Sequence, residues 1–451
     1  MTAPSIAPLL NPLLDELVEF RRDLHRHPEV ARTEVRTTAR VADRLRAAGL
    51  EPVLLPGTGL VCDVGASGPL VALRADLDAL PLPDETQLPW ASTVPGASHA
   101  CGHDVHTTCL LGAGLVLAAL EAAGRLPGRV RLIFQPAEEV MPGGALDVLA
   151  AGGLDGVDRA YALHCDPHTD VGRVGSRVGA ITAATDQVTV RVSGRGGHTS
   201  RPHLTEDVVF VLGQIIVGAP AALSRRVDPR AGAALVWGAV QAGSAPNAIP
   251  SRGELAGTFR CLDSDVWGAA GGLISEVVRD IARPYGVEAE VTYVRGVPPT
   301  LNHEGCVATL EAAARAELGP GSVELTPQSL GGEDFAWMLE RVPGAMLRLG
   351  TREPGGRTYD IHRPDFRVDE RAVGIGARVL AAIALQDLGR LDLRSGERTP
   401  ARVPALAAPE LVAPELVAPE RVAPERVPGQ APERGRQLRP DVRATGAAQR
   451  R

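Results

Sequence analysis

One stretch of the sequence brings together thiol and imidazole side chains that could bind a metal ion. It reads Ser98-His-Ala-Cys-Gly-His-Asp-Val-His106, and Cys101 and His103 stand two positions apart in it. In an extended segment, side chains two positions apart leave the backbone on the same side. Thiolate and imidazole suit zinc, and imidazole also accepts manganese, cobalt or nickel. Taken alone, a Cys-x-His pair fits a metal site and a pair of packed structural side chains equally well.

An acidic pair follows an apolar run that is typical of a buried strand. The run Val130 to Pro136 leads into Gln135-Pro-Ala-Glu-Glu139, so Glu138 and Glu139 stand side by side at its end. Two adjacent carboxylates at the mouth of a sheet are unfavourable unless a metal ion or a proton compensates them. One glutamate could bind the metal while its neighbour accepts a proton from water. The alternative is a solvated first turn of a helix, where glutamate is favoured.

Two further histidines stand at similar positions. His164 ends the apolar run Ala160-Tyr-Ala-Leu-His, and His362 lies in Asp360-Ile-His-Arg-Pro364, shortly before a predicted helix. A single histidine of this kind is more often a packed core residue than a ligand. Together with the two clusters, however, they make a Cys, His, Glu, His, His set located in loops or at strand ends. The sites of α/β sheets form at such places.

The periodicity of the sequence predicts the elements that would carry these residues. Apolar residues at helical spacing predict helices at residues 36–48 and 108–123, and short apolar runs lie between them in the first part of the chain. This alternation predicts an α/β core with a central sheet. From residue 184 the pattern changes to alternating strands, as in DQVTVRVSG, with two long helices among them. We therefore expect a discontinuous catalytic domain at residues 1–183 and 299–392, a smaller inserted α+β domain at 184–298, and a tail at 396–451.

The tail is set apart by its prolines. Pro409, Pro414, Pro419 and Pro424 recur every five residues in units such as VAPEL and VAPER. This density of proline prevents continuous helix or sheet, so we expect a disordered or polyproline-like segment with no part in the chemistry.

The composition argues against a nucleic-acid-binding, secreted, membrane-spanning or disulfide-rich protein. The net charge is −7 and the pI about 5.9, without a basic stripe, which argues against nucleic acid as a partner. We see no secretory signal at the N-terminus and no run of about twenty apolar residues, so we expect no membrane span. The six cysteines are scattered rather than arranged as a disulfide framework. A cytoplasmic protein is the expectation.

The motifs taken together resemble the M20 family of metallopeptidases and amidohydrolases, in the aminoacylase-like branch that includes hippurate hydrolases and indole-acetyl-amino-acid hydrolases. The resemblance covers about residues 15 to 390 and keeps the family's order. It rests on the stretches LHRHPE, LRADLDALP, HACGHDVHTT, IFQPAEE, ALH, GRGGHTSRPH, APNAIP, GTFR, GGEDF and IHRPDF. It implies an α/β fold, with a central mostly parallel sheet flanked by helices and an inserted lid or dimerisation domain.

The resemblance also implies a role for each matching residue. Two divalent metal ions per subunit would be bound, zinc or manganese first and cobalt or nickel as alternatives. Cys101 stands where related branches carry a bridging aspartate, and Glu138 matches the general base. The implied metal ligands are Cys101, His103, Glu139, His164 and His362.

Further matches concern residues around the metal ions and on the inserted domain. Asp78 falls where related branches have an aspartate that orients a metal-binding histidine, and Asp76 replaces that histidine, so both are expected to support the ligands. His198 matches a histidine that polarises the scissile carbonyl or holds the substrate carboxylate. Asn247 and Arg260 match substrate-facing positions.

The function implied is hydrolysis of the amide bond in a small N-acylated amino acid. The motifs leave open a metallocarboxypeptidase or dipeptidase, and a deacetylase of acetylated diamino acids. A catalytically silent relative that only binds a ligand is the remote alternative, and the presence of all five candidate ligands and Glu138 argues against it. By analogy with the family, a homodimer or homotetramer is expected.

Overall fold

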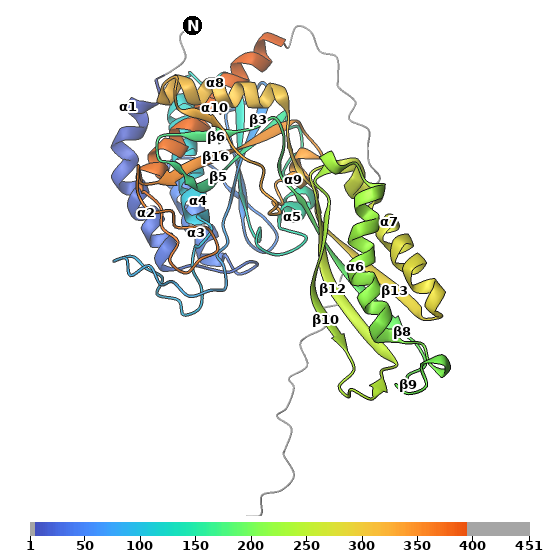
Figure 1. Cartoon of the computed structure of the whole chain (residues 1–451). Coiled ribbons are helices and arrows are strands. Elements are labelled where there is room, and N and C mark those ends of the chain that lie inside the picture. The colour runs from blue at the N-terminus through green and yellow to red at the C-terminus, as the bar shows by residue number, and fades with distance from the viewer. Residues whose placement is uncertain (1–4, 395–451) are drawn as a thin grey trace, which may run out of the picture. The chain divides into compact units, whose positions relative to one another are not determined.

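A large mixed sheet organises most of the chain. The computed structural model describes residues 5–394, so the predicted tail at 396–451 lies outside the described residues. The eight strands have the order β1-β2-β4-β3-β5-β16-β6-β15 (Figure 1). The four central strands β4, β3, β5 and β16 run parallel to one another. The strands are β1 Val53–Leu54, β2 Leu60–Val64, β3 Leu70–Asp76, β4 Arg129–Gln135, β5 Arg159–Asp170, β6 Val174–Ser176, β15 Val323–Leu325 and β16 Gly344–Arg352.

Strand β3 shows why the centre of this sheet is parallel. All seven of its residues, Leu70–Asp76, are buried, as expected for a strand covered by helices on both faces. Val71, Leu73 and Ala75 belong to the largest hydrophobic cluster, whereas Leu70 and Ala72 belong to a smaller cluster on the opposite face. The predicted α/β class with a mostly parallel sheet flanked by helices is confirmed.

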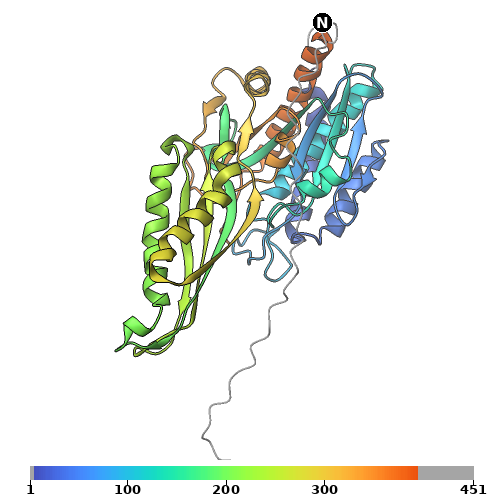
Figure 2. The same cartoon turned by 90° about the vertical axis from the view of Figure 1, so that its right-hand side faces the viewer.

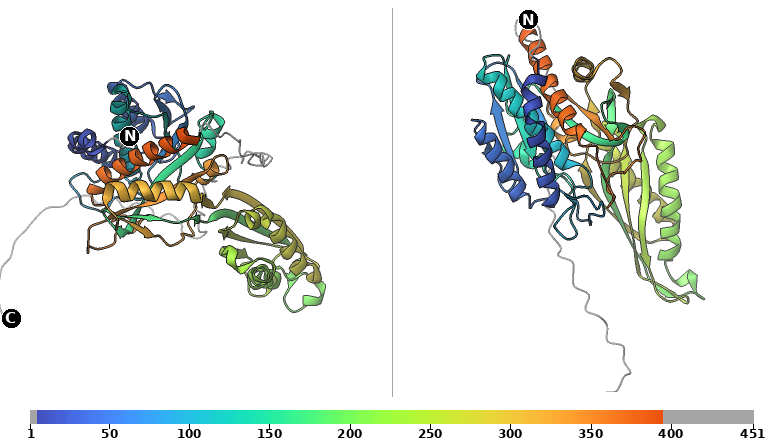
Figure 3. Two further views of the ribbon diagram at one scale, coloured as in Figure 1. Left: turned by 90° about the horizontal axis from the view of Figure 1, so that it is seen from above. Right: turned by 90° about the vertical axis from the view of Figure 1, so that its left-hand side faces the viewer.

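Helices cover the two faces unequally (Figure 3). The face with the largest cluster packs against five long helices and the short helix α1 (Ala7–Leu10), and the other face against two short helices. The five are α2 Leu14–Arg26, α3 Val35–Ala47, α4 His103–Ala122, α8 Glu304–Leu318 and α10 Arg371–Arg394, and the two are α5 Ala145–Ala150 and α9 Ala336–Leu339. The helix predicted from residue 108 in fact begins at His103, directly inside the Cys-x-His stretch.

A second sheet is built from the segment between residues 184 and 297. Its strand order is β10-β12-β8-β13, and all its pairs are antiparallel. Helices α6 and α7 lie together on one face and share a separate hydrophobic cluster with the sheet (Figure 2). The elements are β8 Ala184–Ser193, α6 Val208–Arg226, β10 Ala234–Ala242, β12 Arg252–Cys261, α7 Ser264–Ala282 and β13 Glu288–Val297.

Short elements complete the described chain. Two small antiparallel pairs join β7 with β14 and β9 with β11. The remaining elements are α1 Ala7–Leu10, β7 Gly179–Thr182, β9 Gly197–His198, β11 Ala248–Ile249, β14 Thr300–Asn302, and the 3-10 turns Asn11–Leu13, Pro202–Leu204, Pro229–Ala231 and Arg283–Tyr285.

Three helices in the described part are long and apolar enough to cross a membrane by length and composition, namely α4, α6 and α10. The expectation that no segment reaches this length and apolarity is therefore wrong. Most of α4 and α10 is buried inside the protein, which accounts for their composition. Only about a third of α6 is buried. This helix therefore keeps an apolar face that its own sheet does not cover.

Candidate metal centre

The chemically active side chains gather around the carboxyl ends of the central parallel strands. Glu138 and Glu139 directly follow β4, and His164 lies within β5. Cys101 and His103 stand at the start of α4. Because parallel strands end at the same edge of a sheet, segments distant in sequence meet there.

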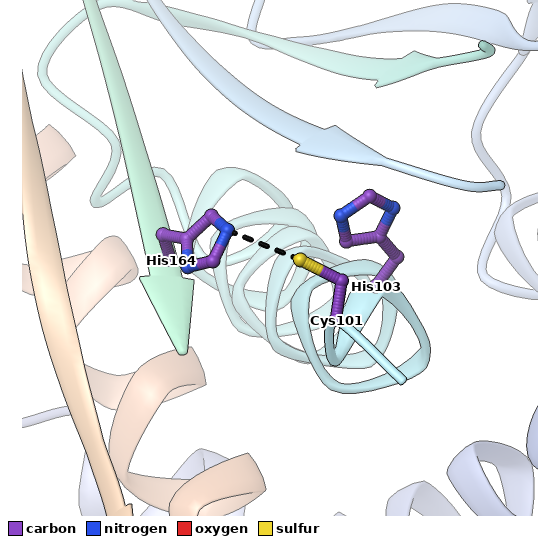
Figure 4. A group of neighbouring side chains, drawn as sticks. All are labelled: Cys101, His103 and His164. Atoms are coloured by element: carbon purple, nitrogen blue, oxygen red, sulfur yellow. Dashed lines mark hydrogen bonds between the residues drawn. The ribbon is translucent and has the colours of Figure 1, made fainter. Parts of the chain in front are cut away.

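The five candidate ligands form two overlapping groups. In the first, ligand atoms of Cys101, His103 and His164 lie within 4.8 Å of one another. In the second, those of Cys101, Glu139 and His362 do so. Cys101 Sγ is 3.5 Å from His164 Nε2 (Figure 4), and His362 Nε2 is 3.4 Å from Glu139 Oε1. The structure thus brings all five together, with the thiol common to both groups.

The ligand atoms of this cluster are placed to bind cations rather than to form hydrogen bonds with one another. Both ring nitrogens of His103 and Oε1 of Glu139 are buried without a hydrogen-bond partner in the described chain. His103 Nε2 lies 3.8 Å from Glu139 Oε1, too far for a hydrogen bond. Ligands about 2.1 Å from a tetrahedral ion stand roughly 3.4 Å apart, so the spacing fits atoms that share an ion. The residues present therefore fit a metal centre.

A hydrogen bond on Nδ1 of His164 leaves Nε2, the nitrogen that faces Cys101, free to bind a metal ion. Its Nδ1 donates to the backbone oxygen of Cys165 at 2.8 Å, so Nε2, the atom facing Cys101, carries the free lone pair. Both nitrogens of His106 are engaged, with Nδ1 2.7 Å from Asp76 Oδ1 and Nε2 accepting from the Cys165 backbone N–H at 2.8 Å. His106 is thus a structural support rather than a ligand.

The charge balance of the cluster also calls for cations. Burial, and then the nearby Glu139, raise the pKa of the Cys101 thiol well above its usual range. Burial, and then Glu333 and Glu139, likewise raise the pKa of Glu138. A divalent ion reverses this balance for a ligating thiol and deprotonates it. For Glu138, a raised pKa suits a carboxyl group that takes up and releases a proton.

Asp78 fixes the backbone of the acidic pair. Its two carboxylate oxygens accept the backbone N–H groups of Glu138 at 3.0 Å and Glu139 at 2.9 Å. The preceding residue, Ala137, has a φ of 54°, and its N–H donates to Glu34. Asp78 is also 3.4 Å from Nδ1 of His103. It therefore contacts both segments that carry ligands.

The comparisons with known proteins identify the family. The model of peptidase family M20/M25/M40 matches residues 72–386. The chain belongs to this family. An N-acetylcysteine deacetylase of Bacillus subtilis is 37% identical, with 82% of this chain and 96% of the relative covered. A crystal structure of a Bacillus subtilis protein, described as a dinuclear metal-binding M20 peptidase, has a TM-score of 0.74 at 34% identity and covers 84% of this chain and 99% of that one.

A longer relative shares the same segment. A Rhodococcus jostii protein named as a glutamate–cysteine ligase is 50% identical over 85% of this chain, but the chain spans only 48% of that protein. Because the chain spans about half of that protein, the ligase activity in its name is not assigned to this chain. With the family shown, the chain is an M20 hydrolase that acts on amide or peptide bonds.

Beyond the expected residues, a buried arginine organises the M20 centre. Arg74 Nη1 is 2.8 Å from Asp76 and 3.2 Å from Glu333, and Nη2 is 2.8 Å from Asp334. Oxygen atoms of Glu138, Glu333 and Asp334 in turn lie within 4.8 Å of one another. Burial raises the pKa of Asp334 to about 7. Arg74 thus neutralises an acidic group that adjoins the proposed base.

The sequence held two signals for this arrangement. Arg74, Asp76 and Asp78 alternate at the end of a strand, which places charged side chains on one face of a buried sheet. Such charges need partners. Glu333 and Asp334 belong to GGEDF, a motif that matched the family without an assigned role. The contact between Arg74 and the acidic pair Glu333 and Asp334 is seen only in the structure.

His362 has an unusual backbone conformation. Its φ is 60°, in the left-handed region that residues other than glycine rarely adopt, and its N–H donates to Ala100 O at 2.7 Å. This hydrogen bond attaches the loop of His362 to the segment that carries Cys101. The histidine itself is half exposed and reaches the cluster from the solvent side.

The structure does not bring the three inserted-segment residues to the cluster. His198 is exposed and its Nδ1 is 2.8 Å from Ser200 Oγ, while Asn247 adjoins it through a backbone hydrogen bond from Thr199. Arg260 donates to Thr185 Oγ1 at 3.1 Å and to the backbone oxygen of Leu330. None of the three contacts a candidate ligand within residues 5–394. Their substrate roles stay predictions.

Proposed function

We propose that the protein hydrolyses the amide bond of N-acylated amino acids with two divalent cations, zinc or manganese first and cobalt or nickel as alternatives. The observation that carries this proposal is the convergence of five ligand side chains into two groups that share Cys101, beside Glu138. The proposed ligands are Cys101, His103, Glu139, His164 and His362. When bound, such ions polarise the amide carbonyl and acidify water.

In the proposed mechanism Glu138 moves the proton. Its carboxylate accepts a proton from the attacking water and returns it to the leaving nitrogen, which balances the hydrolysis. Glu138 Oε2 is 4.0 Å from His103 Nε2, so it adjoins the ligands, and Asp78 holds its backbone. The high pKa that burial and Glu333 impose on Glu138 favours a carboxyl group that can retain the proton until the nitrogen leaves.

We further propose that residues 184–298 act as a lid on the catalytic part, residues 1–183 and 299–392. In this proposal His198 polarises the carbonyl, and Asn247 and Arg260 contact the substrate. Because none of them touches the cluster, these roles require the lid to close on the substrate.

A substrate panel tests the proposed reaction. Acetylated amino acids, hippurate-like amides, dipeptides and acetylated diamino acids are offered to the full chain, with and without chelator. We expect hydrolysis of an N-acyl amino acid that stops on chelation and returns with zinc or manganese. The relative named as an N-acetylcysteine deacetylase supports a small acyl group. Turnover of dipeptides alone would favour the carboxypeptidase or dipeptidase alternative, and chelator-resistant turnover would contradict a metal mechanism.

We also propose that a second copy of the chain covers the β10 edge of the smaller sheet together with the exposed face of α6. Strand β10 is an edge strand, and Val236 and Val240 on it are more than half exposed. On α6, Phe210 is 50% and Val217 is 74% exposed. An unpaired strand edge beside an apolar helix face is a surface that self-association buries.

The variant Val217→Asp tests this dimer. A carboxylate placed in the interface would be buried without a partner, so we expect the dissociation constant to rise at least about 100-fold and the protein to run as a monomer. Light scattering after gel filtration measures the mass. Leu325→Asp is the matched control, since Leu325 is also 74% exposed but lies on β15. A monomeric unmodified chain, or a dimer that survives in Val217→Asp, would refute this interface.

A further inference from the structure

One arginine beside the metal centre has no counter-ion in the described structure. Arg348 lies in β16, and in the parallel register it is the direct neighbour of His164 in β5. It makes no hydrogen bond and no ion pair of 4.0 Å or less with any residue from 5 to 394. Arg348 is partly buried, so its guanidinium is open to a ligand from solvent. The fully buried arginines Arg21 and Arg74, by contrast, have carboxylate partners, Asp104 at 2.7 Å and Asp334 at 2.8 Å.

The side chain of Arg348 lies on the face of the sheet that carries the metal ligand. Leu347 and Leu349 belong to the cluster on the helix-rich face, whereas Met346 belongs to the opposite cluster. Because side chains alternate along a strand, Arg348 shares the face of Met346. His164 shares that face too, since Ala162 in the same strand belongs to the same cluster as Met346. The guanidinium and the imidazole therefore leave the sheet side by side.

The nearby carboxylates do not pair directly with this guanidinium. Burial lowers the pKa of Arg348, and the opposing effect of Glu333 and Asp166 is too small to reverse the shift. Glu333 is 3.2 Å from Arg74, and Asp166 accepts from the Thr169 hydroxyl at 3.0 Å. Burial, and then Arg348, lower the pKa of His164, so the two groups are close enough to interact. Two cations bound at this centre would increase the local positive charge further.

We propose that Arg348 binds the free carboxylate of the amino-acid half of the substrate and so determines which amides are accepted. This inference rests on the proposed function. In an N-acyl amino acid the carboxylate carbon is three bonds from the carbonyl carbon that reacts, within about 4 Å of it. A carbonyl held at the ligands therefore places its carboxylate within reach of the residue beside His164. The planar guanidinium can bind both carboxylate oxygens at once.

The experiment compares an N-acetyl amino acid with its own carboxamide, which has nearly the same shape but carries an NH2 group in place of one oxygen and no negative charge. For the unmodified enzyme we expect kcat/KM to favour the acid by about 100-fold, because an unpaired site rejects the neutral analogue. In Arg348→Met this preference should fall to within about threefold, mainly through a higher KM for the acid. Arg348→Gln, which keeps a polar side chain, should behave alike if the methionine variant does not fold.

Two matched variants make the result specific. Arg352→Met removes another arginine of β16, one that pairs with Asp170 at 2.7 Å, and should keep the preference. Arg260→Met tests the residue that the family resemblance assigns to the substrate. A preference that survives in Arg348→Met, or that is lost in Arg260→Met instead, would overturn the proposal. So would an equal loss of kcat/KM on the acid and on the carboxamide.

A binding measurement separates this inference from the proposed reaction. In the Glu138→Gln background, where turnover is expected to be about a thousandfold slower, titration calorimetry gives dissociation constants for the acid and the carboxamide. We expect the acid to bind about 100-fold more tightly, and the difference to disappear when Arg348→Met is added. Equal binding of the two compounds with Arg348 in place overturns the inference. If the unmodified enzyme hydrolyses no amide, the proposed function fails, and this titration still decides the role of Arg348.

Discussion

Glu138→Gln is expected to lower kcat by roughly a thousandfold while both metal ions remain bound. The glutamine side chain has almost the same shape but cannot accept a proton, and proton transfer by a placed group contributes about 10²–10⁴-fold to a rate. The substitution also leaves the hydrogen bond from the backbone N–H of residue 138 to Asp78 in place. Steady-state kinetics, together with metal analysis of the same sample, measure both parts of the result.

The adjacent position provides the control for Glu138→Gln. Glu139→Gln should lose metal as well as activity, since Glu139 belongs to the group with Cys101 and His362. We therefore expect the two variants to lose a similar part of the rate but to differ in metal content: Glu138→Gln should keep its metal ions, and Glu139→Gln should not. Full activity of Glu138→Gln with metal bound would show that the assigned base is wrong.

Cys101→Ala is expected to remove bound metal and to abolish activity. Cys101 is the one residue common to both ligand groups, so its loss weakens the binding of both cations. We expect less than one ion per chain and a fall of at least about a thousandfold in kcat/KM, since an ion supplies several kcal/mol of charge stabilisation. Metal analysis after dialysis and kinetics under metal-limited conditions measure the two effects.

Two further variants show whether the effect of Cys101→Ala comes from the loss of an anionic ligand or only from the loss of a buried side chain. Cys101→Asp restores an anionic ligand at this position and should recover part of the metal content and activity. Cys109→Ala removes another fully buried thiol, one that packs in the core of α4 and contacts the backbone of α10, and should leave metal binding intact. Normal metal content in Cys101→Ala would contradict a bridging role.

Local patterns predicted most of the elements. The helix expected at 36–48 is Val35–Ala47, because its apolar residues recur at helical spacing and Gly49 ends it. The strand expected at 130–136 is Arg129–Gln135. The predicted start of α4, residue 108, is wrong by five residues, because the helix begins at His103. Its first turn consists mainly of polar residues, so a pattern of apolar residues does not reveal that this turn is helical. Gly102, with a φ of 89°, is the residue that ends the preceding loop.

The convergence of the centre required information that no local pattern holds. Cys101, Glu139 and His362 are far apart in sequence, and only the order of β4, β3, β5 and β16 brings their segments to one edge. The family motifs supplied the ligand set, but not Arg74 or Glu333, whose contact depends on two distant segments meeting. The unpaired guanidinium of Arg348 could not be inferred, because an arginine in an apolar run gives no sign of what its partners are.

The most direct test of the metal centre is anomalous X-ray diffraction from crystals of the full chain, recorded at the absorption edge of the bound metal. We expect two peaks per chain about 3.5–4 Å apart, as in other two-metal sites, one beside His164 and the other beside Glu139 and His362. Cys101 Sγ should lie within bonding distance of both. A peak remote from Cys101, or no peak in protein that is fully active, would contradict the account.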